Sequence, residues 1–147
     1  LKCLDNEESR MAVSSTTPLV RKLGIKEGHA VSFINPPKTF SRSLGDLPTN
    51  VKLDRASPGG LFDVIVFFTH SRAELQREFR YLAGRLQPNG GLWIGWPKKS
   101  SGVSTDLSET VVREVAIARG LIDNKVCPID EGWTAARLVI KPKEKAK

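Results

Sequence analysis

Side chains that could bind a ligand follow several apolar runs of this chain. Thr69 and His70 come directly after the run at residues 62–68, and Lys98 follows the run at residues 92–96. Lysines, hydroxyl groups and free backbone amides can hold an anion, and a histidine can accept a proton. The candidate ligand-binding residues are Asn35, Thr69, His70, Trp96, Lys98, Lys99 and Trp133, with Ser100, Asp130 and Glu131 as secondary candidates.

The polar segment at residues 97–104 is the strongest anion-binding candidate. It contains Lys98, Lys99 and Ser100, and a predicted helix begins shortly after it. Its amide groups and the N-terminus of that helix could therefore act together on one anion. The phosphate-loop order G-x-x-x-x-G-K-[ST] is absent. A solvated surface loop is the alternative interpretation of the same residues.

Two acidic residues, Asp130 and Glu131, precede Trp133 between the last two predicted strands. They could pair with the lysines of the 97–104 segment, or act as an acid and a base. Turn formation, with the tryptophan packed on the end of the sheet, explains the same residues and is favoured. A single histidine such as His70, without a partner near it in sequence, is likewise more often structural or exposed.

The elements that position these side chains begin with a strand and a helix. Residues 62–68 form an unbroken apolar run, which is typical of a parallel strand covered on both faces. Ser71 and Glu74 form a capping box at the start of a helix that is predicted to reach about Leu86. Open α/β sheets bind ligands at the carboxyl ends of their strands. The residues just after position 68 are therefore expected at a binding edge.

The remaining pattern completes a six-stranded sheet. Residues 88–91 predict a tight turn into the strand at 92–96, and the other strands are predicted at 30–35, 51–53, 121–129 and 134–140. Residues 130–133 are too short a link for a parallel crossover, so the last two strands are antiparallel. The sequence predicts a three-layer Rossmann-like α/β fold with a mostly parallel sheet in the order 2-1-3-4-6-5 and the last strand antiparallel.

This layout resembles the class I S-adenosylmethionine-dependent methyltransferases, through residues 62–66, residues 86–94 and the terminal hairpin. The resemblance implies a glycine-rich D-x-G-x-G loop after the first strand and an acidic partner for the cofactor ribose after the second. Asp54 could be that acid. The first strand, however, is followed by Asn35, Pro36 and Pro37, with no glycine before Gly45. Without glycines the backbone should not approach a nucleoside closely, so no cofactor is expected.

The segment Asn35-Pro36-Pro37 also resembles the N/D-P-P-aromatic motif of amino-group methyltransferases. In those enzymes the motif follows the strand that corresponds to residues 62–68, and it grips the target amine. Here it follows the first strand, and Lys38 replaces the aromatic residue. A turn that ends the strand is the favoured interpretation.

At a closer level the chain resembles domain-of-unknown-function 3052, a family of uncharacterised bacterial proteins. The matching segments are residues 17–26, 93–103 and 126–133. This resemblance implies a shortened methyltransferase-like fold and brings no assigned activity.

The sequence favours a non-catalytic or regulatory binding module for a small anionic ligand or a protein partner. A divergent S-adenosylmethionine-dependent methyltransferase is the alternative. Nucleic-acid binding through the basic surface ranks third, since the chain lacks the aromatic platforms that bind RNA bases.

Composition bounds these interpretations. The chain has 147 residues and a formal net charge of +7, which favours anionic partners. One domain is predicted at residues 11–141, with a disordered or upstream tail at 1–10 and a basic tail at 142–147. Two cysteines do not offer a zinc site. No apolar run approaches the ~20 residues that span a bilayer, and no signal peptide is evident, so a cytoplasmic location without membrane contact is expected.

Overall fold

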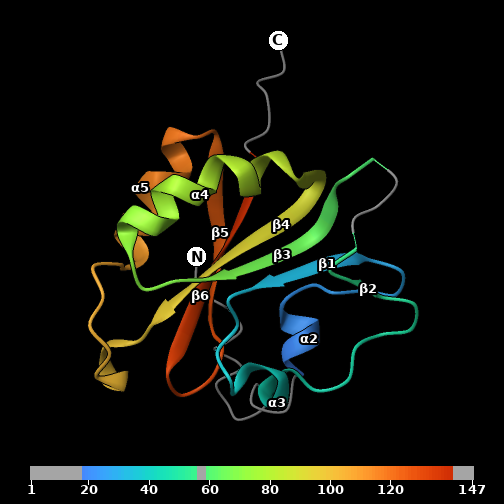
Figure 1. Ribbon diagram of the computed structural model, residues 1–147, viewed down its shortest axis with the longest axis horizontal. Helices are drawn as coiled ribbons and strands as arrows, with labels where there is room; N and C mark the ends of the chain where they lie inside the picture. Colours follow the sequence, from blue (N-terminus) through green and yellow to red (C-terminus); the bar gives the residue numbers. More distant parts are fainter. Residues whose placement is uncertain (1–17, 56–58, 141–147) are drawn as a thin grey trace.

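The computed structural model describes residues 18–55 and 59–140. In that part of the chain, six strands form one sheet in the order β2-β1-β3-β4-β6-β5 (Figure 1), which confirms the predicted order. The predicted tails at residues 1–10 and 142–147 lie outside the described residues. The strands are β1 (Ala30–Ile34), β2 (Lys52–Leu53), β3 (Phe62–Phe68), β4 (Leu86–Pro97), β5 (Leu121–Pro128) and β6 (Trp133–Ile140).

The first four strands are parallel, and β6 is antiparallel to both of its neighbours. Strand β1 pairs in parallel with β2 and β3, and β3 pairs in parallel with β4. Strand β6 lies between β4 and β5, with Trp133 opposite Pro97. The carboxyl ends of β1 to β4 therefore meet at one edge, and the β5–β6 hairpin tip joins them there.

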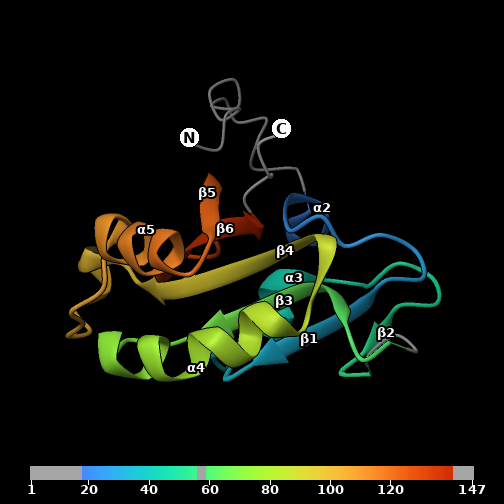
Figure 2. The ribbon, with the colours of Figure 1, turned by 90° about the horizontal axis from the view of Figure 1, so that it is seen from above.

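Helices cover both faces of this sheet. Helices α4 (Arg72–Gly84) and α5 (Glu109–Ala118) pack on one face, and α2 (Leu19–Lys22) and α3 (Phe40–Leu44) pack on the other. Figure 1 shows the first pair above the strands and the second pair below them. In Figure 2, α5 lies towards β5 and β6, while α4 packs against β4. The three predicted layers are thus present.

The central strands are apolar on both sides because each face contacts a helix layer. Ile65 and Phe67 of β3 belong to the cluster beneath α4 and α5, whereas Val66 and Phe68 belong to the cluster beneath α2 and α3. This alternation explains the unbroken apolar run. On the second face, the buried Trp93 donates its indole N–H to the carbonyl oxygen of Leu23 at 3.1 Å and so ties the end of α2 to β4.

Local signals at the helix ends are only partly as predicted. Ser71 caps α4 as expected, because its hydroxyl accepts the N–H of Glu74 at 3.1 Å. The predicted extension of this helix to Leu86 is wrong, since α4 ends at Gly84 and Leu86 already belongs to β4. Helix α5 is capped by Ser108, whose hydroxyl accepts the N–H of Val111.

The predicted turn at residues 88–91 is an irregular part of β4. Phe62 pairs with Leu86 and Val64 pairs with Gly91, so β4 uses extra residues between two neighbouring contacts with β3. A β-bulge of this kind increases the local twist. Gly90 is required there, because a Cβ atom at this position would lie 2.6 Å from the carbonyl oxygen of Asp63. The glycines that suggest a turn in sequence thus serve a close approach between strands.

Candidate functional site

The predicted candidate residues gather at the carboxyl edge of the sheet, but they divide between its two faces. Trp96 is buried in the cluster beneath α4 and α5, whereas Trp133 packs against the cluster beneath α3. His70 is exposed beyond the end of β3. The segment after β4 and the β5–β6 hairpin tip are joined at this edge, since the N–H of Lys98 donates to the carbonyl oxygen of Gly132 at 2.9 Å. The structure therefore brings these residues to one edge without placing them around one cavity.

The side chain of Thr69 forms hydrogen bonds with residues at the start of α4. Its side chain is buried, its hydroxyl donates to the carboxylate of Glu74, and it accepts the N–H of Ser71 at 3.1 Å. The carbonyl oxygen of the next residue, His70, accepts a hydrogen bond from the Thr105 hydroxyl at 2.7 Å. The imidazole of His70 makes no hydrogen bond with a described residue, so it is the group at the end of β3 that can meet a ligand.

In the lysine segment after β4, some of the backbone amide groups already form hydrogen bonds within the segment. Lys99 begins a short 3-10 helix, Lys99–Ser101, and both Lys99 and Ser100 are exposed. The Ser101 hydroxyl donates to the carbonyl oxygen of Lys98 at 2.7 Å and accepts the N–H of Val103 at 3.1 Å. These contacts fix the loop, while the ammonium groups of Lys98 and Lys99 make no ion pair with a described residue.

Backbone N–H groups at the N-termini of the nearby helices α4 and α5 already donate to side chains of this chain. The carboxylate of Asp106 accepts the N–H of Arg72 at 2.7 Å at the start of α4. The hydroxyl of Ser108 fills the same role at α5. A ligand anion at the 97–104 segment would thus gain little from either helix terminus, contrary to the expectation from sequence.

The acidic hairpin tip is built as a turn. One carboxylate oxygen of Asp130 accepts the N–H groups of Gly132 and Trp133 at 2.8 and 3.0 Å. The other accepts the hydroxyl of Thr39, at 3.0 Å, from the loop after β1. The two local hydrogen bonds agree with the turn interpretation, and the bond to Thr39 also links the last hairpin to the first crossover. Glu131 is exposed.

An aromatic row closes the face beneath α3 at this edge. The rings of Phe33, Phe40, Phe68 and Trp133 follow one another edge to face, with centroids 4.9, 4.9 and 5.4 Å apart. Such pairs add to the free energy gained from burial alone. Trp133 and Phe33 are the half-buried ends of the row, and Phe40 of α3 and Phe68 of β3 are buried between them. This packing agrees with the expectation that a tryptophan covers the end of the sheet.

Next to Trp133 lies a hollow of about 480 Å³. Asp130, Glu131 and Trp133 line it, together with residues outside the predicted set, among them Arg42, Ser43 and Val103. One sequence pattern could have located part of this lining. It is the three- and four-residue spacing of Thr39, Arg42 and Ser43, which is typical of one helix face. A second, shallower hollow lies over His70 and Ser104–Asp106.

The turns after β1 and β2 have unusual backbone conformations. Asn35 and Asp54 both take positive φ angles, 56° and 59°, in the left-handed region that favours glycine. Asn35 thus supplies the turn for which the sequence shows no glycine. Asp54 is exposed, and one of its carboxylate oxygens accepts the Ser32 hydroxyl at 3.2 Å. The sharp turn and the carboxylate lie at the ends of adjacent parallel strands.

Residues 18–55 and 59–140 contain no group of three histidine, cysteine, aspartate or glutamate side chains that could hold a metal ion. No helix in these ranges is long and apolar enough to cross a membrane.

No family model and no curated protein matches the chain. The resemblance to domain-of-unknown-function 3052 therefore stays a prediction. Solved methyltransferase structures do match. The N-methyltransferase NodS from Bradyrhizobium japonicum WM9 is 15% identical with a TM-score of 0.55, over 94% of this chain and 99% of that chain. A SAM-dependent methyltransferase from Aquifex aeolicus is 14% identical with a TM-score of 0.51, over 83% and 88%.

A third match is the protein DhpI, solved as a complex with SAH. It is 14% identical with a TM-score of 0.56, over 92% of this chain and 88% of that chain. At such identities the likeness shows the fold alone. The chain has a Rossmann-like, methyltransferase-like fold.

Proposed function

We propose that this chain binds S-adenosylmethionine at the carboxyl edge of β1 and β2 and acts as a divergent methyltransferase. The observation that carries the proposal is the pair of turns at Asn35 and Asp54, set on a methyltransferase-like sheet. In nucleotide-binding α/β folds, a sharp turn follows the first strand, and an acidic side chain roughly 20 residues further on binds the ribose. Asn35 and Asp54 stand in that order and at about that spacing.

The residues present fit the nucleoside part of this cofactor. Asp54 is exposed, and its second carboxylate oxygen makes no hydrogen bond with a described residue, so it can accept a ribose hydroxyl. The left-handed turn at Asn35 carries the chain away from the end of β1. When bound, the cofactor would supply an electrophilic methyl group. The exposed imidazole of His70, at the end of the neighbouring β3, would take the proton from an incoming acceptor group.

One observation favours a second candidate, a non-catalytic module that binds a small anionic ligand or a protein partner. Pro36 and Pro37 carry no N–H group, so the loop after β1 lacks two donors that could hold the charged end of the cofactor. Under this interpretation the hollow beside Trp133, lined by Arg42, would receive the ligand.

Calorimetry with S-adenosylmethionine and S-adenosylhomocysteine separates the two candidates. We expect both to bind, and Asp54→Asn to weaken binding about 10-fold or more, because a hydrogen bond to a charged group contributes about 1.5–3 kcal/mol. Asparagine also tolerates positive φ, so the turn should survive.

Asp46→Asn is the matched control. Asp46 is equally exposed but lies before β2, at the other end of that strand, so its replacement should leave affinity unchanged. Absence of binding for both compounds, or equal losses in the two variants, would refute the cofactor proposal and leave the non-catalytic module.

A further inference from the structure

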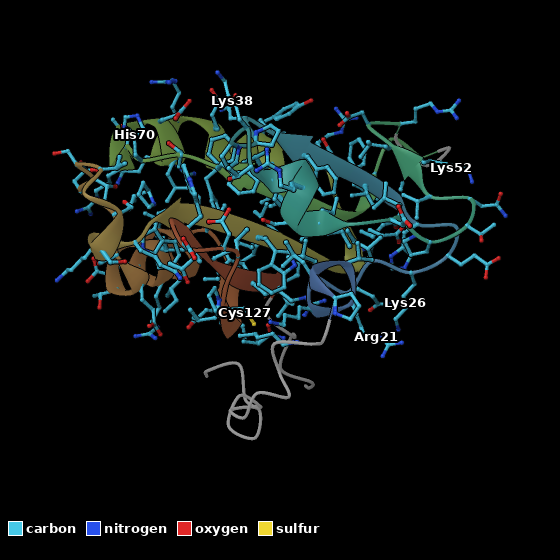
Figure 3. The ribbon with its side chains drawn as sticks, turned by 90° about the horizontal axis from the view of Figure 1, so that it is seen from below. Arg21, Lys26, Lys38, Lys52, His70 and Cys127 are labelled. Carbon is cyan, nitrogen blue, oxygen red and sulfur yellow. The ribbon has the colours of Figure 1, made fainter. Side chains whose placement is uncertain are left out.

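A second polar cavity lies at the amino edge of the sheet, away from the candidate site. It has a volume of about 370 Å³ and is formed between the end of α2 and the starts of the central strands. Figure 3 shows Arg21 and Lys26, which line it, at the opposite end of the molecule from His70. A cavity of this size is within the range that small ligands occupy. Its lining residues are scattered along the sequence, and no motif predicts it.

The lining of this cavity is strongly cationic. It includes one carboxylate, Asp63, which already accepts the N–H of Ala30 at 2.9 Å. None of its cationic side chains forms a hydrogen bond or an ion pair with residues 18–55 or 59–140. The cationic lining residues are Arg21, Lys22, Lys26, Lys125 and Arg137. Their charges are therefore available to an external anion.

Arg137 is the most informative member of the set. It is half-buried on β6, opposite Lys125 of β5, and burial lowers the pKa of its guanidinium from the ordinary value. Removing a cation from water without a counter-charge is unfavourable, so an arginine kept in this state calls for an explanation.

Gly91 makes room for the guanidinium. A Cβ atom at position 91 would lie 2.5 Å from Nε and 2.9 Å from Cζ of Arg137. The side chain therefore lies across the bare backbone of β4, at the point where β4 is irregular. This close approach fixes the guanidinium beside the cavity and limits its conformational freedom.

His29 adds a directed donor. Its Nδ1 accepts the N–H of Lys26 at 3.1 Å, so in the uncharged ring the proton is on Nε2. The cavity thus offers the N–H of His29, the planar fork of Arg137 and the lysine ammonium groups. These donors come from α2, the loop after α2, β5 and β6. Arginine forks match the oxygens of a phosphate group, and ammonium groups add charge.

We propose that this amino-edge cavity binds the phosphate groups of a small phosphorylated ligand, with Arg137 and Lys125 at its base. Lys26, Arg21 and Lys22 stand around the bound anion, and Arg137 gives the directional contact. The site is independent of the proposed cofactor site, which lies at the opposite edge of the sheet.

The test uses inorganic pyrophosphate as the probe, titrated into the full chain by calorimetry at low and at physiological salt. We expect saturable binding that weakens at least 10-fold in Arg137→Met and in Lys125→Met. Arg80→Met is the matched control, because Arg80 is exposed on α4 and does not line the cavity. Its replacement removes the same charge. It should change affinity less than 2-fold.

A stability measurement separates binding from a structural role. Without pyrophosphate, Arg137→Met should melt at the same or a higher temperature, since replacing an unpaired half-buried charge with an apolar side chain relieves its desolvation. With pyrophosphate, the wild-type melting temperature should rise and that of Arg137→Met should not. Gly91→Ala, which displaces the guanidinium while keeping its charge, should also lose affinity.

Three results would overturn the proposal. One is the absence of pyrophosphate binding, and another is an equal loss of affinity in Arg80→Met, which would mean attraction by net charge alone. The third is tight, salt-sensitive binding of a short oligonucleotide with no binding of pyrophosphate, because this would assign the surface to a nucleic-acid backbone.

Discussion

The indole of Trp93 offers the sharpest test of how α2 is attached to the sheet. Trp93 and Leu23 are both fully buried, and the indole N–H is the donor to the Leu23 carbonyl oxygen at 3.1 Å. That carbonyl lies at the end of a helix with only four residues, which has little stability of its own. Trp93→Phe removes the donor while keeping an aromatic ring in the core.

The expected loss in the free energy of unfolding has two parts. An unpaired buried carbonyl costs about 1–3 kcal/mol. The space left by the smaller ring adds about 1 kcal/mol. We therefore expect a loss of about 2–4 kcal/mol in urea unfolding, with the midpoint shifted to lower urea and an unchanged slope.

Trp133→Phe is the control for this variant. Trp133 is half-buried, its indole N–H makes no hydrogen bond with a described residue, and a phenyl ring can keep the edge-to-face contact with Phe68. Its loss should stay below about 1 kcal/mol. Equal losses in the two variants, or a loss below about 1 kcal/mol for Trp93→Phe, would show that the hydrogen bond does not hold α2 in place.

Three other pairs of variants test single features of the fold by urea unfolding. Gly90→Ala should cost more than about 2 kcal/mol, because its Cβ would lie 2.6 Å from a backbone oxygen of β3, whereas Gly84→Ala, with nothing within 4 Å, should stabilise by about 0.5 kcal/mol. Similar values for both would contradict the bulge geometry. Asp130→Ala should cost about 1–3 kcal/mol through three lost hydrogen bonds, and Glu131→Ala less than about 0.5. Asn35→Ala should cost about 1 kcal/mol and Asn35→Gly none, and a reversed order would argue against the left-handed turn.

Strand order could be predicted because the local patterns were consistent with one another. The apolar run at 62–68 needs cover on both faces, and the short link at 130–133 allows only an antiparallel pair. The turn predicted at 88–91 was wrong for a physical reason. Glycines permit both tight turns and close strand contacts, and only the position of Asp63 shows which applies.

The sites could be predicted less well, because they depend on contacts distant in sequence. The edge was located from strand ends, yet nothing in the sequence shows that Thr69 is held by Glu74 or that Asp130 reaches Thr39. The absent glycine after β1 led to the expectation that the backbone does not approach a nucleoside closely, and the left-handed conformation of Asn35 was not predicted. The amino-edge cavity joins residues from α2 to β6, so periodicity gives no sign of it.

The position of β6 has a consequence for how the chain acquires its structure. During synthesis β5 leaves the ribosome before β6. Strand β5 nevertheless joins the sheet only through β6, which lies between β4 and β5. Until residues 133–140 have been made, the open side of β4 and the whole of β5 are exposed edges that could pair with another chain. The nascent protein should therefore be prone to aggregation in the interval just before β6 is complete.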